Sequence, residues 1–162
     1  MGNNLRTLIL LLIISVGLIG CSKEEEDYTD WEPTTYETVN NLDGVVMIVK
    51  ERVVSSKKLT VILENSSNLP ILYGDPYTLE KKIDGKWYQV PVLVGDDYYT
   101  TEGIGYELAP SHRHELEINW NMLYADLHKG EYRIVKDVLD FSSSQGHGTY
   151  NEYYLAAEFT FK

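Results

Sequence analysis

Between residues 43 and 162 the chain alternates apolar and polar residues in short segments, and this pattern restricts its fold more than any other feature. A period of two turns one face of a strand toward a core and the other toward solvent. Turn-forming residues interrupt the alternation at short intervals, and no long segment has the period of an amphipathic helix. The pattern predicts an all-β domain of about seven strands, packed as two antiparallel sheets.

The individual strands are predicted from β-branched and aromatic residues at alternate positions. Asp84-Gly85 is the clearest hairpin signal, because glycine readily adopts the positive φ that a tight turn requires. Pro91 indicates that the second arm of this hairpin lies at a sheet edge or ends there. The predicted strands cover residues 45–54, 58–64, 77–83, 87–93, 114–120, 131–138 and 153–161, with a short candidate strand at 106–109 and one helical turn at 121–127.

The N-terminus has the three-part layout of a secretory signal. A polar start carries Arg6, an apolar run covers residues 8–19, and the small residue Gly20 precedes Cys21. The apolar run is shorter than the roughly 20 residues that a membrane-spanning helix needs. The residues at its end, Leu18-Ile19-Gly20-Cys21, resemble the lipobox of bacterial lipoprotein precursors.

The resemblance to the lipobox implies a maturation pathway. In that family a peptidase cuts before the cysteine, and the thiol carries a diacylglyceryl group. Residues 1–20 are therefore predicted to be a signal peptide cleaved between Gly20 and Cys21, and Cys21 is predicted to be lipidated. Each buried methylene contributes about 0.8 kcal/mol, so two acyl chains such as palmitate hold a protein firmly on a bilayer. The predicted location is the extracytoplasmic face of a cell membrane.

Residues 21–42 are predicted to form a lipidated, acidic and flexible tether. The segment is polar and poor in aliphatic residues, so it buries too little apolar area to offset its ordering entropy. Trp31 and Tyr36 are exceptions, and one of them could dock on the domain or lie at the membrane interface. Since Cys21 is the only cysteine, the domain at 43–162 has no disulfide and depends on its apolar core.

The net charge of −11 at pH 7 restricts the partners of the chain. A strongly negative surface disfavours electrostatic binding to nucleic acid, so no nucleic-acid partner is predicted. The 13 tyrosines suit half-buried sheet surfaces and interfaces, where the ring is dry and the hydroxyl is wet.

One stretch, residues 127–134, resembles the run into the sixth strand of an immunoglobulin-like sandwich. There a tyrosine near the strand start bonds back to upstream backbone, two residues before a disulfide cysteine. Tyr132 stands at the tyrosine position, and Ile134 replaces the cysteine with an aliphatic side chain, as a disulfide-free version would. More broadly, residues 58–65, 73–88, 115–120 and 130–136 resemble the bacterial Ig-like domain of Gram-positive surface proteins and lipoproteins. The resemblance implies a sandwich module with no catalytic residues to transfer.

Two predicted loops, at residues 95–105 and 141–153, carry the best candidate binding surface. Rigid aromatic side chains on sandwich loops anchor partners at low entropic cost. The residues that flank or line these loops are Tyr98, Tyr99, Tyr106, Tyr150, Tyr153 and Tyr154. The chain is therefore predicted to be a surface-anchored, non-enzymatic interaction module that binds a protein or an envelope glycan.

Two other functions remain open at this stage. The loop at 95–105 could enter a protease cleft, which would make the domain a proteinase inhibitor. His112 and His114 share one face of a strand beside Glu115, and two imidazoles can begin a zinc or copper site. A third ligand would have to come from His128 or His147, and solvent-exposed histidines at a strand start are the simpler interpretation.

Other polar clusters lack the spacing that chemistry requires. Asp96, Asp97 and Glu102 do not follow the D-x-D-x-D-G order of a calcium loop. Residues 142–144 are serines near His147, but no G-x-S-x-G element positions them as a nucleophile. No cofactor is predicted, and the chain is not expected to be an enzyme.

Overall fold

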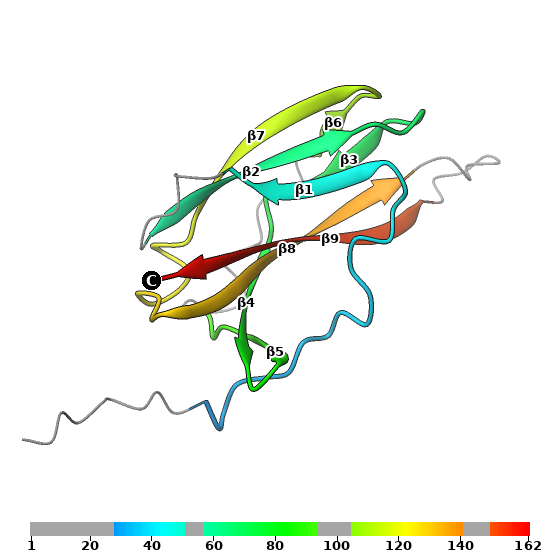
Figure 1. Cartoon of the computed structure of the whole chain (residues 1–162). Helices are drawn as coiled ribbons and strands as arrows, with labels where there is room; N and C mark the ends of the chain where they lie inside the picture. The colour runs from blue at the N-terminus through cyan, green and yellow to red at the C-terminus, as the bar shows by residue number, and fades with distance from the viewer. Residues whose placement is uncertain (1–27, 51–56, 94–104, 141–149) are drawn as a thin grey trace, which may run out of the picture. The chain divides into compact units, whose positions relative to one another are not determined.

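The computed structural model describes residues 28–50, 57–93, 105–140 and 150–162. All regular structure in these ranges is β, which confirms the predicted all-β antiparallel sandwich (Figure 1). The nine strands are β1 (Val45–Val49), β2 (Lys58–Asn65), β3 (Ile71–Tyr73), β4 (Thr78–Ile83), β5 (Lys86–Gln89), β6 (Tyr106–Leu108), β7 (His112–Asn119), β8 (Gly130–Asp140) and β9 (Asn151–Phe161).

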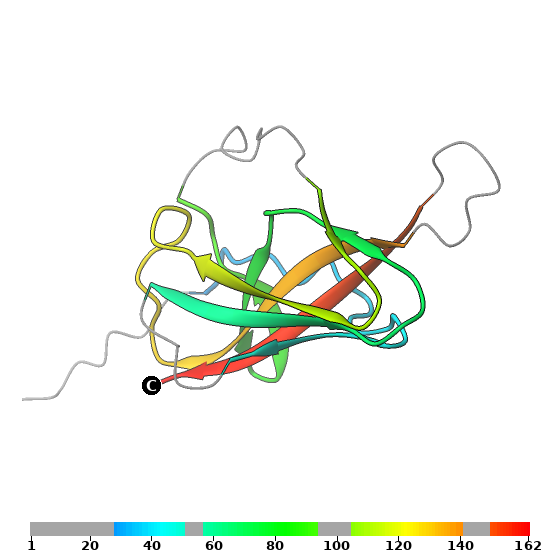
Figure 2. The same ribbon diagram turned by 90° about the horizontal axis from the view of Figure 1, so that it is seen from above.

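The strands form two sheets. The smaller sheet has the order β1-β2-β7, and the larger has the order β5-β4-β8-β3-β6, with β9 on the other side of β8. The long strand β8 pairs first with β4, through Tyr132 to Val135, and then with β3, through Val138 to Asp140. Along its opposite side it pairs with β9 over its whole length. Figures 1 and 2 show β8 and β9 side by side, with β1, β2 and β7 as the second layer.

The core lies between the inner faces of the two sheets. On β2 the alternate residues Leu59, Val61 and Leu63 are fully buried, as the period of two predicted. On β8 the same alternation buries Tyr132 and Ile134. Three aromatic rings stack within the core: Tyr132 on Phe159 at 5.6 Å between centroids, and Phe159 on Trp120 at 5.9 Å. Such ring pairs contribute about 0.5–1.5 kcal/mol beyond their buried area, so the apolar core can replace a disulfide.

The hairpin of β4 and β5 forms as predicted. Ile83 pairs with Lys86, and the two residues between them, Asp84 and Gly85, have φ values of 50° and 79°. Two positive φ values make a type I′ turn, whose twist matches that of the flanking strands. β5 ends at Gln89, before Pro91, and is a terminal strand of its sheet.

Some elements differ from the prediction. The strand predicted for residues 45–54 ends at Val49, and residues 51–56 lie outside the described ranges. β3 was not predicted, because three residues after Pro70 are too short to show a period. Residues 121–124 form a single turn in which the amide groups of Leu123 and Tyr124 both donate to the carbonyl of Trp120.

The packed unit begins at Trp31, so the predicted tether at 21–42 extends too far into the domain. Trp31 and Leu42 pack against the core, and backbone hydrogen bonds join the segment between them to the larger sheet. We call residues 31–42 the N-terminal strap. A composition argument missed it because the strap is held mainly by hydrogen bonds and aromatic contacts, not by aliphatic burial. In the described part of the chain no helix is long and apolar enough to cross a membrane.

Candidate functional site

A groove of about 430 Å³ opens beside the terminal strands of the two sheets. One wall is residues 115–119 of β7, and the other is the β3–β4 connection at residues 73–77 together with Tyr106 of β6. Lys136 of β8 also lines the groove. β6 and β7 follow one another in the chain, so a short corner brings one edge of each sheet to this side of the sandwich.

Two tyrosines form the aromatic part of the groove. Tyr73 and Tyr106 are cross-strand partners, with ring centroids 5.5 Å apart. Tyr73 is 5% exposed, and a hydrogen bond of 2.8 Å joins its hydroxyl to Nδ1 of His114. Burial raises the pKa of Tyr73, and Tyr106 and Asp75 act in the same direction. Tyr106 is 40% exposed, so Tyr106 is available to a ligand while Tyr73 supports it.

Lys136 holds the β3–β4 wall in place. Its Nζ donates to the carbonyl oxygens of Gly74 at 2.7 Å, Pro76 at 2.8 Å and Asp75 at 3.2 Å. An ammonium has three donors, and three carbonyls therefore satisfy it. Burial lowers the pKa of Lys136 to about 8, against the opposing attraction of Asp137 and Asp75. With its three donors bound to these carbonyls, Lys136 shapes the groove.

The backbone of β7 faces the groove. In an antiparallel pair, successive residues direct their backbone groups alternately toward and away from the partner strand. The amide of Trp120 donates to the carbonyl of Lys57 on the β2 side, whereas the carbonyl of Asn119 accepts from the Tyr77 hydroxyl at 3.1 Å. By alternation, Glu115 and Glu117 also direct their N–H and C=O groups away from β2. No described strand pairs with this edge.

The N-terminal strap covers the β5 edge of the larger sheet. The amide of Thr34 donates to the Trp87 carbonyl at 3.0 Å, and the amide of Gln89 donates to the Glu32 carbonyl at 2.8 Å. These bonds flank an antiparallel bridge between Pro33 and Tyr88. The strap therefore continues the sheet beyond β5. Pro33 has no N–H to donate, so the hydrogen bonds are made by its neighbours Glu32 and Thr34.

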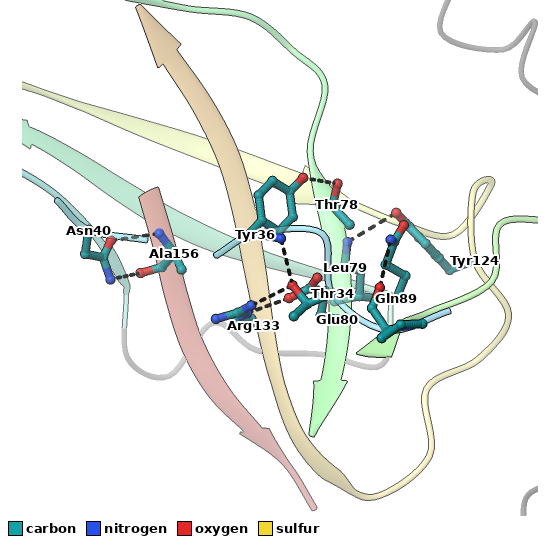
Figure 3. A network of polar contacts seen from close by, with 11 residues as sticks. Thr34, Tyr36, Asn40, Thr78, Leu79, Glu80, Gln89, Tyr124, Arg133 and Ala156 are labelled. Atoms are coloured by element: carbon teal, nitrogen blue, oxygen red, sulfur yellow. Dashed lines mark hydrogen bonds and ion pairs between the residues drawn. The ribbon is translucent and has the colours of Figure 1, made fainter. Parts of the chain in front are cut away.

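A single residue of the strap, Asn40, covers part of the β9 edge. Its amide donates to the carbonyl of Tyr154 at 2.7 Å, and its side chain exchanges two hydrogen bonds with the backbone of Ala156, at 2.8 and 3.1 Å (Figure 3). Asn40 has a φ of 58°, a left-handed conformation that asparagine tolerates better than most residues. The strap thus covers the β5 edge and part of the β9 edge, whereas the edge of β7 lines the groove.

Beneath the strap lies a buried ion pair. Nε of Arg133 is 2.6 Å from the Glu80 carboxylate, and the two side chains are 7% and 0% exposed. Arg133 also donates from Nη2 to Thr34 at 3.1 Å and lies 4.5 Å from the centre of the Trp87 ring. Figure 3 shows the guanidinium bonded to both Glu80 and Thr34, with Tyr36 bonded to Thr78 nearby. This network fastens the strap to the sheet, and its ion pair is buried.

Comparison with known proteins addresses the family of the domain. A family profile described as Bacterial Ig-like domain matches residues 41–160. The chain belongs to the bacterial Ig-like domain family. The resemblance found in the sequence is thereby confirmed for the domain. No curated protein matches the chain. A solved structure described as a protein from Archaeoglobus fulgidus is 14% identical and covers 75% of this chain and 98% of its own, with a TM-score of 0.27.

The Ig-like domain does not bring all of the predicted tyrosines to one surface. Tyr106 lies in the groove, Tyr150 is exposed just before β9, and Tyr153 packs against the core. Tyr154 lies on the opposite face of the sheet, with its ring 4.9 Å from that of Tyr36. Tyr98 and Tyr99 lie outside the described residues, as does most of the loop that would act as a proteinase inhibitor.

The tyrosine near the start of β8 makes the back-bond that its position implies. The hydroxyl of Tyr132 donates to the carbonyl of His128 at 2.7 Å, and Ile134 two residues later is fully buried. These contacts join the turn before β8 to the core, so Tyr132 has a structural role in this Ig-like domain.

His112 and His114 share the inner face of β7, opposite Asn65 and Leu63 of β2. Nδ1 of His112 is 2.8 Å from the carbonyl of Pro110, and Nδ1 of His114 is bonded to Tyr73. Among the described residues there is no group of three or more potential metal ligands. The remaining candidates lie outside the described residues: Gly20, Cys21, Asp96, Asp97, Glu102, His147 and the serines at 142–144.

Sequence reasoning missed three residues of the groove. Tyr73 and Tyr77 were read only as parts of neighbouring segments, because the short β3 was not predicted. Lys136 carried a usable signal: it follows Tyr132 and Ile134 at the next inward position of one strand. A lysine at an inward position requires buried partners, and those partners turned out to be three carbonyls of the groove wall.

Proposed function

We propose that this chain is a membrane-anchored, non-catalytic binding module that contacts its partner through the groove between β6 and β7. Membership of the bacterial Ig-like domain family supports an interaction role. The observation that carries the proposal is the groove itself, where the partly exposed ring of Tyr106 stands across from an edge of β7 that no described strand occupies. Aromatic side chains of this kind are frequent anchors of binding interfaces.

The anchor in this proposal is Cys21, on the strength of the lipobox at residues 18–21. Because the strap packs from Trp31 onward, only residues 22–30 separate the lipidated cysteine from the domain. At about 3.3–3.6 Å per residue, that segment spans at most roughly 30 Å. The proposed anchor therefore keeps the Ig-like domain close to the membrane surface, where it would meet partners in or near the envelope.

Metabolic labelling tests the anchor. Cells that produce the full chain or its Cys21→Ser variant are grown with labelled palmitate. Label is expected in the unaltered protein and not in the variant, because serine lacks the thiol that accepts the diacylglyceryl group. Label in both proteins, or in neither, would contradict lipidation at Cys21.

Site-specific photo-cross-linking in cells tests the groove. Tyr106 is replaced by a photoreactive phenylalanine analogue, and the matched control places the same analogue at Glu158, an exposed position of β9. Light-dependent adducts are expected at position 106 and not at position 158. Digestion with protease or with a glycan hydrolase then classifies the captured molecule. Absence of adducts at position 106, or equal adducts at both positions, would contradict the proposed site.

A further inference from the structure

We infer that the groove receives an extended, basic peptide segment of a partner protein, which adds to β7 as a fourth strand of the smaller sheet. The inference rests on the proposed function and names the class of partner for the same groove. Strand addition of this kind draws affinity from main-chain hydrogen bonds and specificity from alternate side chains.

The first argument is the unequal covering of the sheet edges. Exposed edges are usually blocked, since they pair with other chains. In this domain the strap closes β5 and Asn40 closes part of β9, while β1 lies next to β9. The remaining terminal strand of the larger sheet, β6, has only three residues. β7 lacks such a cover within the described ranges, and it is the edge that lines the groove.

The second argument is backbone geometry. Glu115, Glu117 and Asn119 direct their backbone groups into the groove, and within the described ranges the Asn119 carbonyl is the one among them that is bonded, to the Tyr77 hydroxyl. The edge from residue 115 to residue 119 is roughly 14 Å long at the rise of an antiparallel strand. A peptide of about five residues could therefore pair with it, with Tyr106 and the β3–β4 wall against its other side.

The third argument is charge. Glu115 and Glu117 project from the outer face of β7, with side chains 47% and 56% exposed. Their ion pairs with Lys50 and Lys58 are exposed, and such pairs are weak enough for each carboxylate to bind a second cation. An added strand places the Cβ atoms of its outward side chains about 5 Å from those of Glu115 and Glu117, so Lys or Arg at alternate positions is favoured. A second copy of β7 would set glutamates opposite one another, which disfavours self-pairing.

The test uses the full-length protein and synthetic peptides of alternating Lys and Val. Binding is followed by calorimetry, and the matched peptide of alternating Glu and Val is the charge control. Two further Lys-Val peptides carry N-methyl groups on one or the other alternate set of residues. Because only one set faces β7, one N-methylated peptide is expected to lose at least about tenfold in affinity while the other retains it.

Protein variants test the same edge from the other side. Glu117→Pro removes an amide that points into the groove and leaves the hydrogen bonds to β2 intact, and edge strands tolerate proline. Glu117→Ala removes the same charge but keeps the amide, and is its matched control. The proline variant is expected to bind the Lys-Val peptide at least about tenfold more weakly than the alanine variant. If circular dichroism shows that the proline variant is misfolded, the N-methylated peptides decide the question on unaltered protein.

Several outcomes would overturn the inference: no binding of the Lys-Val peptide, equal binding of the Glu-Val peptide, or equal binding of the two N-methylated peptides. A dimer that Glu117→Pro disrupts would show that the edge serves a second copy, and capture of glycan at position 106 would show a carbohydrate site. If adducts of a protein persist at position 106 while no peptide binds, strand addition is wrong and the proposed groove function stands. If the adducts are absent as well, both proposals fail.

Discussion

Replacing Arg133 with methionine should destabilise the Ig-like domain by about 3–5 kcal/mol, because it leaves the buried carboxylate of Glu80 without its partner. Glu80 is fully buried and its carboxylate lies 2.6 Å from the guanidinium. Methionine fills much of the space of the arginine stem, so the loss comes mainly from the charge. Small domains unfold with about 5–15 kcal/mol, and the variant would therefore lose a large part of its stability.

The double variant Glu80→Leu/Arg133→Met removes both charges. It therefore shows whether the ion pair itself stabilises the domain or whether only the loss of one partner is costly. Replacement of a buried ion pair by apolar residues of similar volume is often neutral or stabilising. Oε1 of Glu80 has no hydrogen-bond partner among the described residues, so the pair is incompletely satisfied. We expect the double variant to lie within about 1 kcal/mol of the unaltered protein, and therefore to be at least about 2 kcal/mol more stable than Arg133→Met alone.

Urea unfolding followed by tryptophan fluorescence measures these changes. The control is Lys82→Met, which removes another cation near Trp87, 5.5 Å from the ring centre. The Lys82–Glu131 pair is longer, at 3.7 Å, and is partly exposed, so the control should cost at most about 1 kcal/mol. The reasoning fails if Arg133→Met costs no more than Lys82→Met, or if the double variant is as unstable as Arg133→Met.

Three further variants test other contacts. Tyr132→Phe should cost about 1–2 kcal/mol in urea unfolding, because it removes the hydrogen bond to the His128 carbonyl; an unchanged midpoint would deny that contact a role in stability. Asn40→Gly keeps the left-handed backbone but loses both side-chain bonds to Ala156, so the strap should be cleaved faster by limited proteolysis. Unchanged cleavage would count against the role of Asn40 as a cover of the β9 edge. The pKa of Lys136 is about 8 in the folded protein and ordinarily 10.5. Above pH 8 the folded protein therefore loses the Lys136 proton while the unfolded chain keeps it. The free energy of unfolding should then rise by about 2 kcal/mol between about pH 7 and 9.5. Lys136→Met should abolish that rise, and a rise that persists in the variant must come from another group.

The features of the fold that depend on a few neighbouring residues could be predicted from the sequence. A period of two can bury one face only in a strand, so the apolar residues of β2, β8 and β9 located those strands without reference to their partners. The type I′ turn at Asp84-Gly85 is equally local, since its positive φ values depend on the two residues themselves. Tyr132 was found from a motif whose hydrogen bond spans only four residues.

The candidate site was predictable only in part. Tyr106 was singled out as an aromatic beside a loop, and the structure places it in the groove. Its neighbour Tyr73 comes from a strand too short for a period, and the β7 wall approaches from the other sheet. The strap was missed for a related reason: Asn40 binds Ala156, 116 residues away in the sequence, and composition contains no information about such a contact.

By itself, the sequence determined that this chain forms short antiparallel strands, roughly where most of them lie, and that their core contains no disulfide, because side-chain alternation and turn residues act over a few residues. Tertiary structure alone decided which strand edges are covered by the strap and which edge lines a groove. Those outcomes depend on hydrogen bonds between backbone groups far apart in the chain, and every residue carries the same backbone groups. Side-chain patterns therefore cannot specify which of them will meet.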